Sequence, residues 1–191
     1  MKKILIMISG RGSNMKAIAE NVQNGILKNI CEIIEVFSNK KNAAGLKIAE
    51  NLGLKTTVIE SKGKKRSVFN SLLLEHLKSK KPDFIVLAGY MKIIPPQIIR
   101  EFPNKIINIH PADTSLHQGL HGYEWAWKNK LKSTKITVHF VDEELDTGKV
   151  IGKQEIDISD CKSVDEVEQK GLKVEHQFYS ECLKKIFSSE S

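Results

Sequence analysis

The residues best suited to chemistry in this sequence are Asn108, His110 and Asp146. Asn108 and His110 end an apolar run and are two positions apart, so in an extended strand both side chains point to the same side. An Asn amide can donate a hydrogen bond to a developing oxyanion, and a protonated imidazole can add a second donor or pass a proton to a leaving nitrogen. A carboxylate such as Asp146 would raise the pKa of His110 and favour its protonated form. These residues predict a site that stabilises a tetrahedral oxyanion and moves its protons.

A structural role is the alternative for the same residues: His110 would cap a strand end, and Asp146 would form the turn before Gly148. His139 lies in the middle of an expected strand and is interpreted as structural, and His76 is expected on a solvated helix face. The sequence leaves the remaining histidines open, namely His117, His121 and His176.

A glycine-rich stretch, Gly10-Arg11-Gly12-Ser13-Asn14, follows the first apolar run. Between a strand and a helix such a stretch presents backbone N–H groups to an anion, and the helix dipole assists. Ser13 and Asn14 would add side-chain donors or cap the helix; a purely structural tight turn is the alternative. The sixth position of a dinucleotide-binding GxGxxG motif would be Met15, and no GxxxxGK[ST] motif is present. The stretch therefore favours a monophosphate over a dinucleotide or a nucleoside triphosphate.

Short β-branched runs alternate with longer amphipathic stretches, which predicts an α/β protein with repeated βαβ units. The fold class expected is a Rossmann-like, mostly parallel, twisted sheet with helices on both faces and an antiparallel strand pair near the C-terminus. Strands are predicted at 4–8, 33–37, 56–59, 84–87, 106–109, 137–141 and 150–154. Helices are predicted at about 15–22, 43–52, 67–77, 122–130 and from a capping box at Ser163 and Glu166 to about 187.

Ligands of open α/β sheets bind outside the carboxyl ends of the strands. The first, fourth and fifth predicted strands would present their terminal loops at one edge, so Asn14, Met91 and His110 are expected to meet in one cleft.

Composition and charge describe an ordinary globular protein of 191 residues, with 40% apolar and 28% charged residues. The net charge of +7 predicts attraction to anions. The lysine runs at 62–66 and 78–81 lack interleaved aromatics, so they are interpreted as solvated rather than as polyanion sites.

Three cysteines without CxxC spacing indicate neither a disulfide framework nor a zinc site. No segment is long and apolar enough to span a membrane, and we expect a cytoplasmic protein.

Five motifs together resemble the folate-dependent phosphoribosylglycinamide formyltransferase family of purine synthesis. They extend in the same order over nearly the whole chain: Ile8 to Asn14, Phe37 to Lys40, Val86 to Ile93, Asn108 to Pro111, and Val138 to Gly148. The resemblance implies one formyltransferase domain over 1–191, in which about 1–100 binds the phosphate and nucleotide and about 101–191 binds folate and carries catalysis.

The resemblance also implies residue roles. Asn108, His110 and Asp146 would be the catalytic trio. The substrate phosphate would be held by Gly12, Ser13 and Asn14, with Glu175 near the ribose or glycinamide end. Folate would lie along Met91, Lys92, Ile93, Ile94 and Asn108, the 142–146 loop, and Arg66, whose cation suits an acidic folate tail.

The implied reaction is attack of the substrate amine on the formyl carbon of 10-formyltetrahydrofolate, which acts as co-substrate. Protonated His110 and Asn108 would stabilise the oxyanion, and the departing folate nitrogen would receive a proton. The resemblance implies no metal, small-molecule substrates only, no nucleic-acid or membrane partner, and a monomer or homodimer.

This chain departs from the family pattern after Pro111, where Ser-Leu-Leu-Pro and a Pro-Gly are common. It has Ala112 to His121 instead, and Asp113 in this segment is a candidate competitor for the charge of His110.

Two alternative functions are kept. The first is another formyltetrahydrofolate-using enzyme, a methionyl-tRNA formyltransferase or a formyltetrahydrofolate hydrolase, which would be expected to carry a further domain that 191 residues do not accommodate. The second is a basic α/β module that binds nucleic acid without chemistry, with strongly salt-dependent affinity.

Overall fold

The computed structural model describes residues 1–144 and 146–189. They form a seven-stranded sheet in the order β3-β2-β1-β4-β5-β6-β7. The strands are β1 (Lys2–Ile8), β2 (Cys31–Ser38), β3 (Thr56–Val58), β4 (Phe84–Leu87), β5 (Ile106–His110), β6 (Ser133–Phe140) and β7 (Val150–Asp157). The helices are α1 (Ser13–Asn24), α2 (Ala44–Asn51), α3 (Arg66–Lys80), α4 (Pro96–Glu101), α5 (Gly122–Lys128) and α6 (Val164–Ser189). Strands β1 to β5 are parallel, and β6 and β7 add antiparallel neighbours beyond β5, as the sequence predicted.

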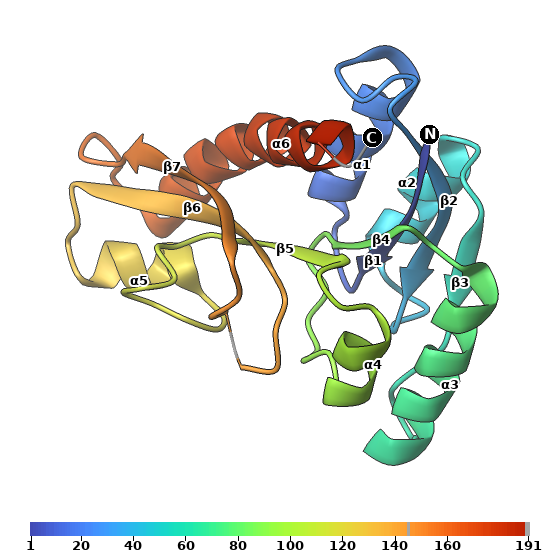
Figure 1. The fold of residues 1–191 in the computed structure, drawn as a ribbon. Helices are drawn as coiled ribbons and strands as arrows, with labels where there is room; N and C mark the ends of the chain where they lie inside the picture. The colour runs from blue at the N-terminus through green and yellow to red at the C-terminus, as the bar shows by residue number, and fades with distance from the viewer. Residues whose placement is uncertain (145, 190–191) are drawn as a thin grey trace.

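The central strands are buried on both faces because helices cover the two sides of the sheet (Figure 1). In β1, Ile4, Ile6 and Ile8 belong to one core, while Leu5 and Met7 belong to the other. This alternation follows from the two-residue period of a strand, and it explains why β1 and β4 are apolar throughout.

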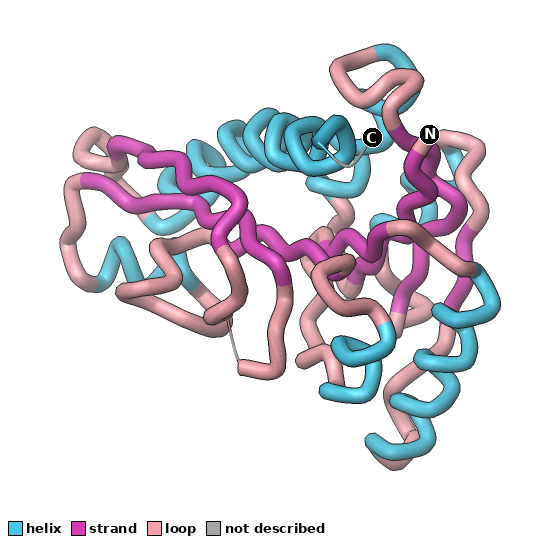
Figure 2. The backbone as a smooth tube through the Cα atoms, in the orientation of Figure 1, coloured by secondary structure: helices cyan, strands magenta, loops and turns pink. Residues whose placement is uncertain are grey.

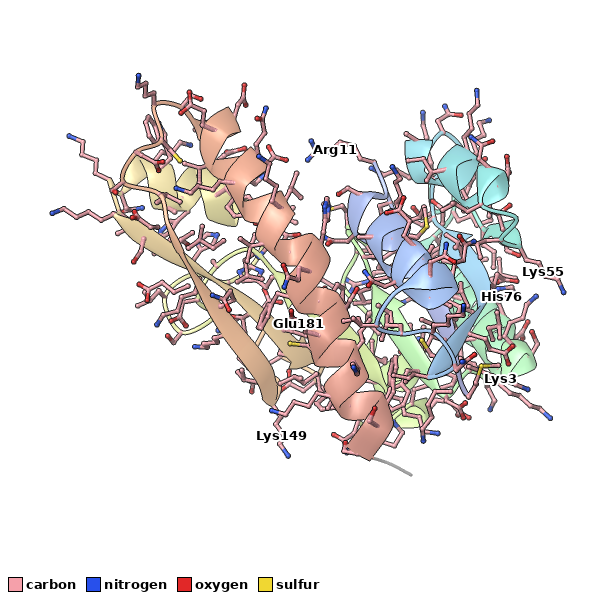
Figure 3. The ribbon with its side chains drawn as sticks, turned by 90° about the horizontal axis from the view of Figure 1, so that it is seen from above. Lys3, Arg11, Lys55, His76, Lys149 and Glu181 are labelled. Atoms are coloured by element: carbon pink, nitrogen blue, oxygen red, sulfur yellow. The ribbon has the colours of Figure 1, made fainter. Side chains whose placement is uncertain are left out.

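Each core is closed by a different group of helices. The first core includes residues of α1, α2, α5 and α6, and the second includes residues of α3 and α4. Figure 2 shows the strands as one continuous band with helices on either side of it. The long helix α6 lies across one face of the sheet, as the view from above in Figure 3 shows. Its Tyr179 hydroxyl donates to the carbonyls of Leu87 in β4 and Ile107 in β5, each at 3.0 Å.

Local sequence signals account for several helix boundaries. Gly53 follows α2 with φ of +72°, the left-handed conformation that a helix C-terminus favours. At the start of α6 the N–H of Glu166 donates to Ser163 Oγ at 3.2 Å, and the Glu166 carboxylate accepts from the N–H of Lys162 at 2.8 Å. The capping interaction predicted from the sequence is therefore confirmed, with the return contact one residue earlier than expected.

Two features of the sheet and its helices differ from the prediction. Helix α4 was not expected, because only six residues follow the Pro95 N-cap, too few to show a helical period. Strand β6 begins at Ser133, four positions before the predicted start, and pairs with β7 through Asp157. No helix among residues 1–144 and 146–189 is long and apolar enough to cross a bilayer.

Candidate active site

A cavity of about 990 Å³ opens at the carboxyl edge of β1, β4 and β5. This is the edge at which the strand order reverses, because β2 and β4 lie on opposite sides of β1. Asn14, Met91 and His110 all line the cavity, as predicted. The cavity is lined by all the residues predicted to act in catalysis, to bind the phosphate end of the nucleotide or to bind folate: Gly12, Ser13, Asn14, Arg66, Met91, Lys92, Ile93, Ile94, Asn108, His110, Asp146 and Glu175.

The three predicted catalytic residues converge at one point of this cavity. Asn108 and His110 come from β5, and Asp146 comes from the loop between β6 and β7. His110 Nδ1 lies 3.5 Å from Asp146 Oδ2, and both side chains are more than nine-tenths buried. Asp146 has φ of +54°, a left-handed conformation that Asp tolerates better than most residues and that belongs to a turn.

The second nitrogen of His110 fixes the tautomer of the ring. His110 Nε2 lies 3.0 Å from the backbone carbonyl of His117. A carbonyl oxygen only accepts hydrogen bonds, so Nε2 carries a hydrogen in both charge states of the ring. In the neutral ring Nδ1 then has the lone pair, and it is the atom that exchanges a proton beside Asp146.

Asp146 raises the pKa of His110, as the sequence predicted, but the net shift is downward. Burial lowers the pKa of His110 below its usual value of 6.5, and the Asp146 charge and the hydrogen bond to His117, which raise the pKa, do not compensate. Positive charge on the neighbouring His139 and His117 lowers it further. Loss of water around a buried cation exceeds the attraction of one carboxylate, which favours the neutral imidazole.

Asp146 is held by two groups in addition to His110. Its Oδ2 accepts from the N–H of Gly119 at 2.8 Å, and its Oδ1 lies 3.4 Å from His139 Nε2. Burial raises the pKa of Asp146, but the hydrogen bonds from His139 and Gly119 and the charges of the histidines reverse that effect and lower it overall. The carboxylate therefore stays ionised beside the proton-exchanging nitrogen.

His139 belongs to the site, although the sequence interpretation made it only structural. In the antiparallel β5–β6 pair His139 is the direct partner of Asn108. Its Nδ1 donates to the Phe140 carbonyl at 2.9 Å, and its Nε2 is 3.4 Å from Asn108 Nδ2. The strand register was the signal that would have revealed it, since cross-strand partners share one face of the sheet.

His76 is also placed differently from the prediction. Its side chain is only 14% exposed and pairs with the buried carboxylate of Glu35, which Lys80 also contacts. Burial raises the pKa of Glu35, but hydrogen bonds from Lys80 and His76 lower it below its usual value. This pair lies outside the cavity and has a structural role.

The glycine-rich turn is built for close backbone approach. Gly12 has φ of +76°, and a Cβ on it would lie 2.6 Å from the Cα of Gly45. The N–H of Gly45 donates to the Gly10 carbonyl at 3.0 Å and holds the two loops together. The turn leads directly into α1, and Gly12 and Ser13 at the start of this helix line the cavity.

Ser9 joins the turn to the loop after β4. Its hydroxyl donates to Asn39 Oδ1 at 2.6 Å and accepts from the N–H of Met91 at 2.8 Å. The expected folate-contacting residues thus start from a fixed position. Met91 and Ile93 are 55% and 65% exposed, Ile94 is buried, and the Lys92 ammonium lies 5.4 Å from the Phe69 ring centroid.

The unusual segment 112–121 folds against the proposed catalytic residues. His117 provides the carbonyl for His110, and Gly119 provides the N–H for Asp146. The His117 ring stacks on Trp125 with centroids 5.0 Å apart. The contact of His110 with the His117 carbonyl and that of Asp146 with the Gly119 N–H were not predicted, since both use backbone atoms of a segment that has no regular pattern.

Asp113 does not compete for the charge of His110. Its two oxygens accept from Lys153 at 2.5 Å and from Lys135 at 3.0 Å, and one of them accepts from Ser115. Burial raises the pKa of Asp113, but these bonds lower it well below its usual range overall. The ion pairs anchor the start of the segment to β6 and β7.

Metal ligands are absent from the described part of the chain: it contains no group of three His, Cys, Asp or Glu side chains arranged to hold a metal ion. The final loop residue of the predicted folate region before Asp146, Leu145, lies outside the described residues.

Comparison with known proteins places the chain in a family. Residues 2–183 match the family described as formyl transferase. Phosphoribosylglycinamide formyltransferase of Haemophilus influenzae is 35% identical over 96% of this chain and 86% of its own length. The Escherichia coli enzyme of the same name is 33% identical over 92% of this chain and 82% of its own. A trifunctional purine biosynthetic protein of Drosophila melanogaster is 32% identical over 95% of this chain, which spans 14% of that longer protein.

Solved structures agree with these relatives. The phosphoribosylglycinamide formyltransferase of Bacillus halodurans superposes with a TM-score of 0.93 at 30% identity, covering 100% of this chain and 97% of that one. The Streptococcus pneumoniae protein gives 0.89 at 33% identity, covering 98% and 99%. This chain therefore belongs to the formyl transferase family, among the phosphoribosylglycinamide formyltransferases.

Proposed function

We propose that this protein transfers the formyl group of 10-formyltetrahydrofolate to the amine of 5-phosphoribosylglycinamide, giving the formylglycinamide ribonucleotide and tetrahydrofolate in purine synthesis. Members of the family take the formyl group from a folate-derived donor. The two substrates are anionic, which suits a chain with a net charge of +7.

One observation carries the proposal. Asn108, His110 and Asp146 line the same cavity as the glycine-rich turn and the loop that contains Met91 to Ile94. An amine donor bound at the turn and a formyl donor bound along the loop would therefore meet at these three side chains.

The roles of the three residues follow from their charge states. As the amine forms its bond to the formyl carbon, Asn108 Nδ2 donates to the oxygen that becomes negative. Neutral His110 accepts at Nδ1 the proton that the amine loses, and ionised Asp146 stabilises the imidazolium. His110 then returns this proton to the folate nitrogen as the old carbon–nitrogen bond breaks, so no net proton is gained or lost.

The binding roles follow from position. Gly12 and Ser13 supply N–H and hydroxyl donors to the phosphate, and Asn14 and Glu175 lie beside them at the nucleotide end of the cavity. Arg66, the first residue of α3, also lines the cavity, and its cation suits the acidic tail of the folate.

The direct test mixes the protein with both substrates and follows release of tetrahydrofolate together with formation of the formylated ribonucleotide. Release that requires the ribonucleotide supports the proposal. Release without it would indicate a hydrolase, and no release with either substrate would exclude both reactions.

Asn108→Ala is the matched variant for the oxyanion role. It should lower kcat by roughly 10²–10³ while both KM values stay within about threefold, because the contact strengthens only as charge develops. Unchanged kcat in this variant would remove Asn108 from the mechanism.

A further inference from the structure

A buried polar cluster lies at the nucleotide end of the cavity and is formed by Asn14, Tyr123 and Glu175, here called the Glu175 cluster. Its members come from α1, α5 and α6, and each is 8% exposed or less. Asn14 Nδ2 donates to Glu175 Oε2 at 2.6 Å, and the Tyr123 hydroxyl donates to Glu175 Oε1. Each carboxylate oxygen thus has one donor from the protein.

The orientation of the Asn14 amide is fixed by this arrangement. The amide directs its nitrogen, and not its oxygen, toward Glu175, whose carboxyl oxygen accepts the bond. Asn14 Oδ1 is then left as a buried acceptor with no hydrogen-bond partner among the described residues. A buried acceptor without a partner costs free energy, so its place beside the cavity points to a ligand donor.

The missing partner must be a donor group. Ionised phosphate oxygens are acceptors and would repel Asn14 Oδ1, which argues against the phosphate role that the sequence resemblance implied for this side chain. A phosphoribosylglycinamide carries two suitable kinds of donor, the ribose hydroxyls and the N–H groups of the glycinamide. The Glu175 cluster is therefore suited to the donor groups of the nucleotide, while Gly12 and Ser13 remain available for its phosphate.

The Tyr123 side chain packs against Gly171 of α6, with its hydroxyl directed at Glu175. A Cβ on Gly171 would lie 2.2 Å from the Tyr123 hydroxyl oxygen, so the ring occupies the space that any other residue would fill at this position of α6. Burial, then the charge of Glu175 and the hydrogen bond to it, raise the pKa of Tyr123 far above its usual value. The hydroxyl therefore keeps its proton and remains a donor.

We propose that Tyr123 is a positioning residue for the nucleotide substrate: by holding Glu175 against Asn14 it presents Asn14 Oδ1 to a ribose hydroxyl or a glycinamide N–H. This inference rests on the proposed function. It assigns nucleotide recognition to a side chain on α5, outside the glycine-rich turn and outside the proposed catalytic residues.

Tyr123→Phe tests the inference, since it removes the hydroxyl and keeps the ring against Gly171. The KM for phosphoribosylglycinamide should rise about tenfold, which corresponds to one lost hydrogen bond to a charged group, while kcat and the KM for 10-formyltetrahydrofolate stay within twofold. Inhibition by ribose 5-phosphate separates the two donors. A Ki that rises with the KM identifies a ribose hydroxyl, and an unchanged Ki identifies the glycinamide.

Tyr179→Phe is the matched control. It removes another buried hydroxyl, whose partners are backbone carbonyls of β4 and β5 outside the cluster. It should lower the melting temperature and leave the KM for the ribonucleotide unchanged. Gly171→Ala provides a second test. The added methyl group would displace Tyr123, so the variant should reproduce the increase in ribonucleotide KM of Tyr123→Phe.

Three results would overturn the inference: an unchanged ribonucleotide KM in Tyr123→Phe, an equal rise in both KM values, or an equal loss of affinity for inorganic phosphate, which would assign the cluster to the phosphate. If the wild-type protein shows no turnover, the proposed function fails separately. Calorimetric titration of wild type and Tyr123→Phe with phosphoribosylglycinamide and inorganic phosphate then tests the cluster directly. A loss of affinity for phosphoribosylglycinamide alone supports the inference, and equal affinities of the two proteins for phosphoribosylglycinamide refute it.

Discussion

The Nε2 atom of His110 donates to the backbone carbonyl of His117 at 3.0 Å, and this contact decides which nitrogen of the ring is the base. Nδ1, 3.5 Å from Asp146, accepts and returns the proton in the proposed reaction. Because the carbonyl belongs to the backbone, the tautomer does not depend on the side chain at position 117.

The pH dependence of the reaction follows from the neutral state of His110. Burial lowers the pKa of His110 below 6.5, so the base form predominates at neutral pH and is lost only as the pH falls through this lowered pKa. We expect kcat/KM to be flat near pH 7 and to fall on an acid limb whose midpoint lies below 6.5. Initial rates across pH 4.5 to 8 provide the measurement, and a midpoint above 6.5 would contradict the proposed base role.

His110→Ala and Asp146→Asn should lose turnover far more than binding. General-base catalysis contributes roughly 10²–10⁴-fold, and we expect a fall of that order in kcat for His110→Ala and a smaller one for Asp146→Asn. Dissociation constants for the ribonucleotide, measured calorimetrically, should stay within about threefold. A kcat equal to that of wild type in either variant would show that the residue has another role.

Gly12→Ala should damage nucleotide binding through the backbone. The added Cβ would lie 2.6 Å from the Cα of Gly45 and would force alanine into φ of +76°. The strain should cost about 1–3 kcal/mol of unfolding free energy and raise the ribonucleotide KM, with little change in the folate KM. Gly63→Ala is a suitable control, since Gly63 has φ of +78° but nothing within 4 Å of its Cβ position: it should share part of the stability loss and none of the KM change.

Asp113→Asn should destabilise the protein in a pH-dependent way. The folded-state pKa of Asp113 lies below its usual 3.8, so its contribution is fully present above pH 3.8 and is lost as the pH falls toward the folded pKa. At pH 7 we expect a loss of about 1–3 kcal/mol in unfolding free energy. Urea denaturation at pH 7 and at pH 3 measures the difference in unfolding free energy between variant and wild type. This difference should be smaller at pH 3. A constant difference would mean that the two lysines contribute little.

Much of this architecture could be predicted because the strongest signals in the sequence are local. The apolar runs of β1 and β4, Gly53 after α2 and the Ser163 cap each determine an element through its own neighbouring residues. Helix α4 escaped prediction because a six-residue helix has too few turns to reveal a period.

The site was predictable where motif and strand position coincide, as for Asn108 and His110, and less so where contacts join distant segments. His139 required the register of two strands, the Tyr123–Glu175 bond joins positions 52 residues apart, and the His117 carbonyl lies in an irregular segment. The net downward shift in the pKa of His110 was missed because a sequence indicates neighbouring charges more readily than it indicates the loss of surrounding water.

Helix α6 couples the nucleotide end of the cavity to the first core. The Asn14–Glu175 bond joins residues 161 positions apart, and the same helix fills the first core with Leu183 and Phe187. A single helix thus supplies both packing for the first core and the carboxylate of the nucleotide end of the cavity. A substitution that loosens the packing of α6 would therefore reduce stability and displace Glu175 at the same time.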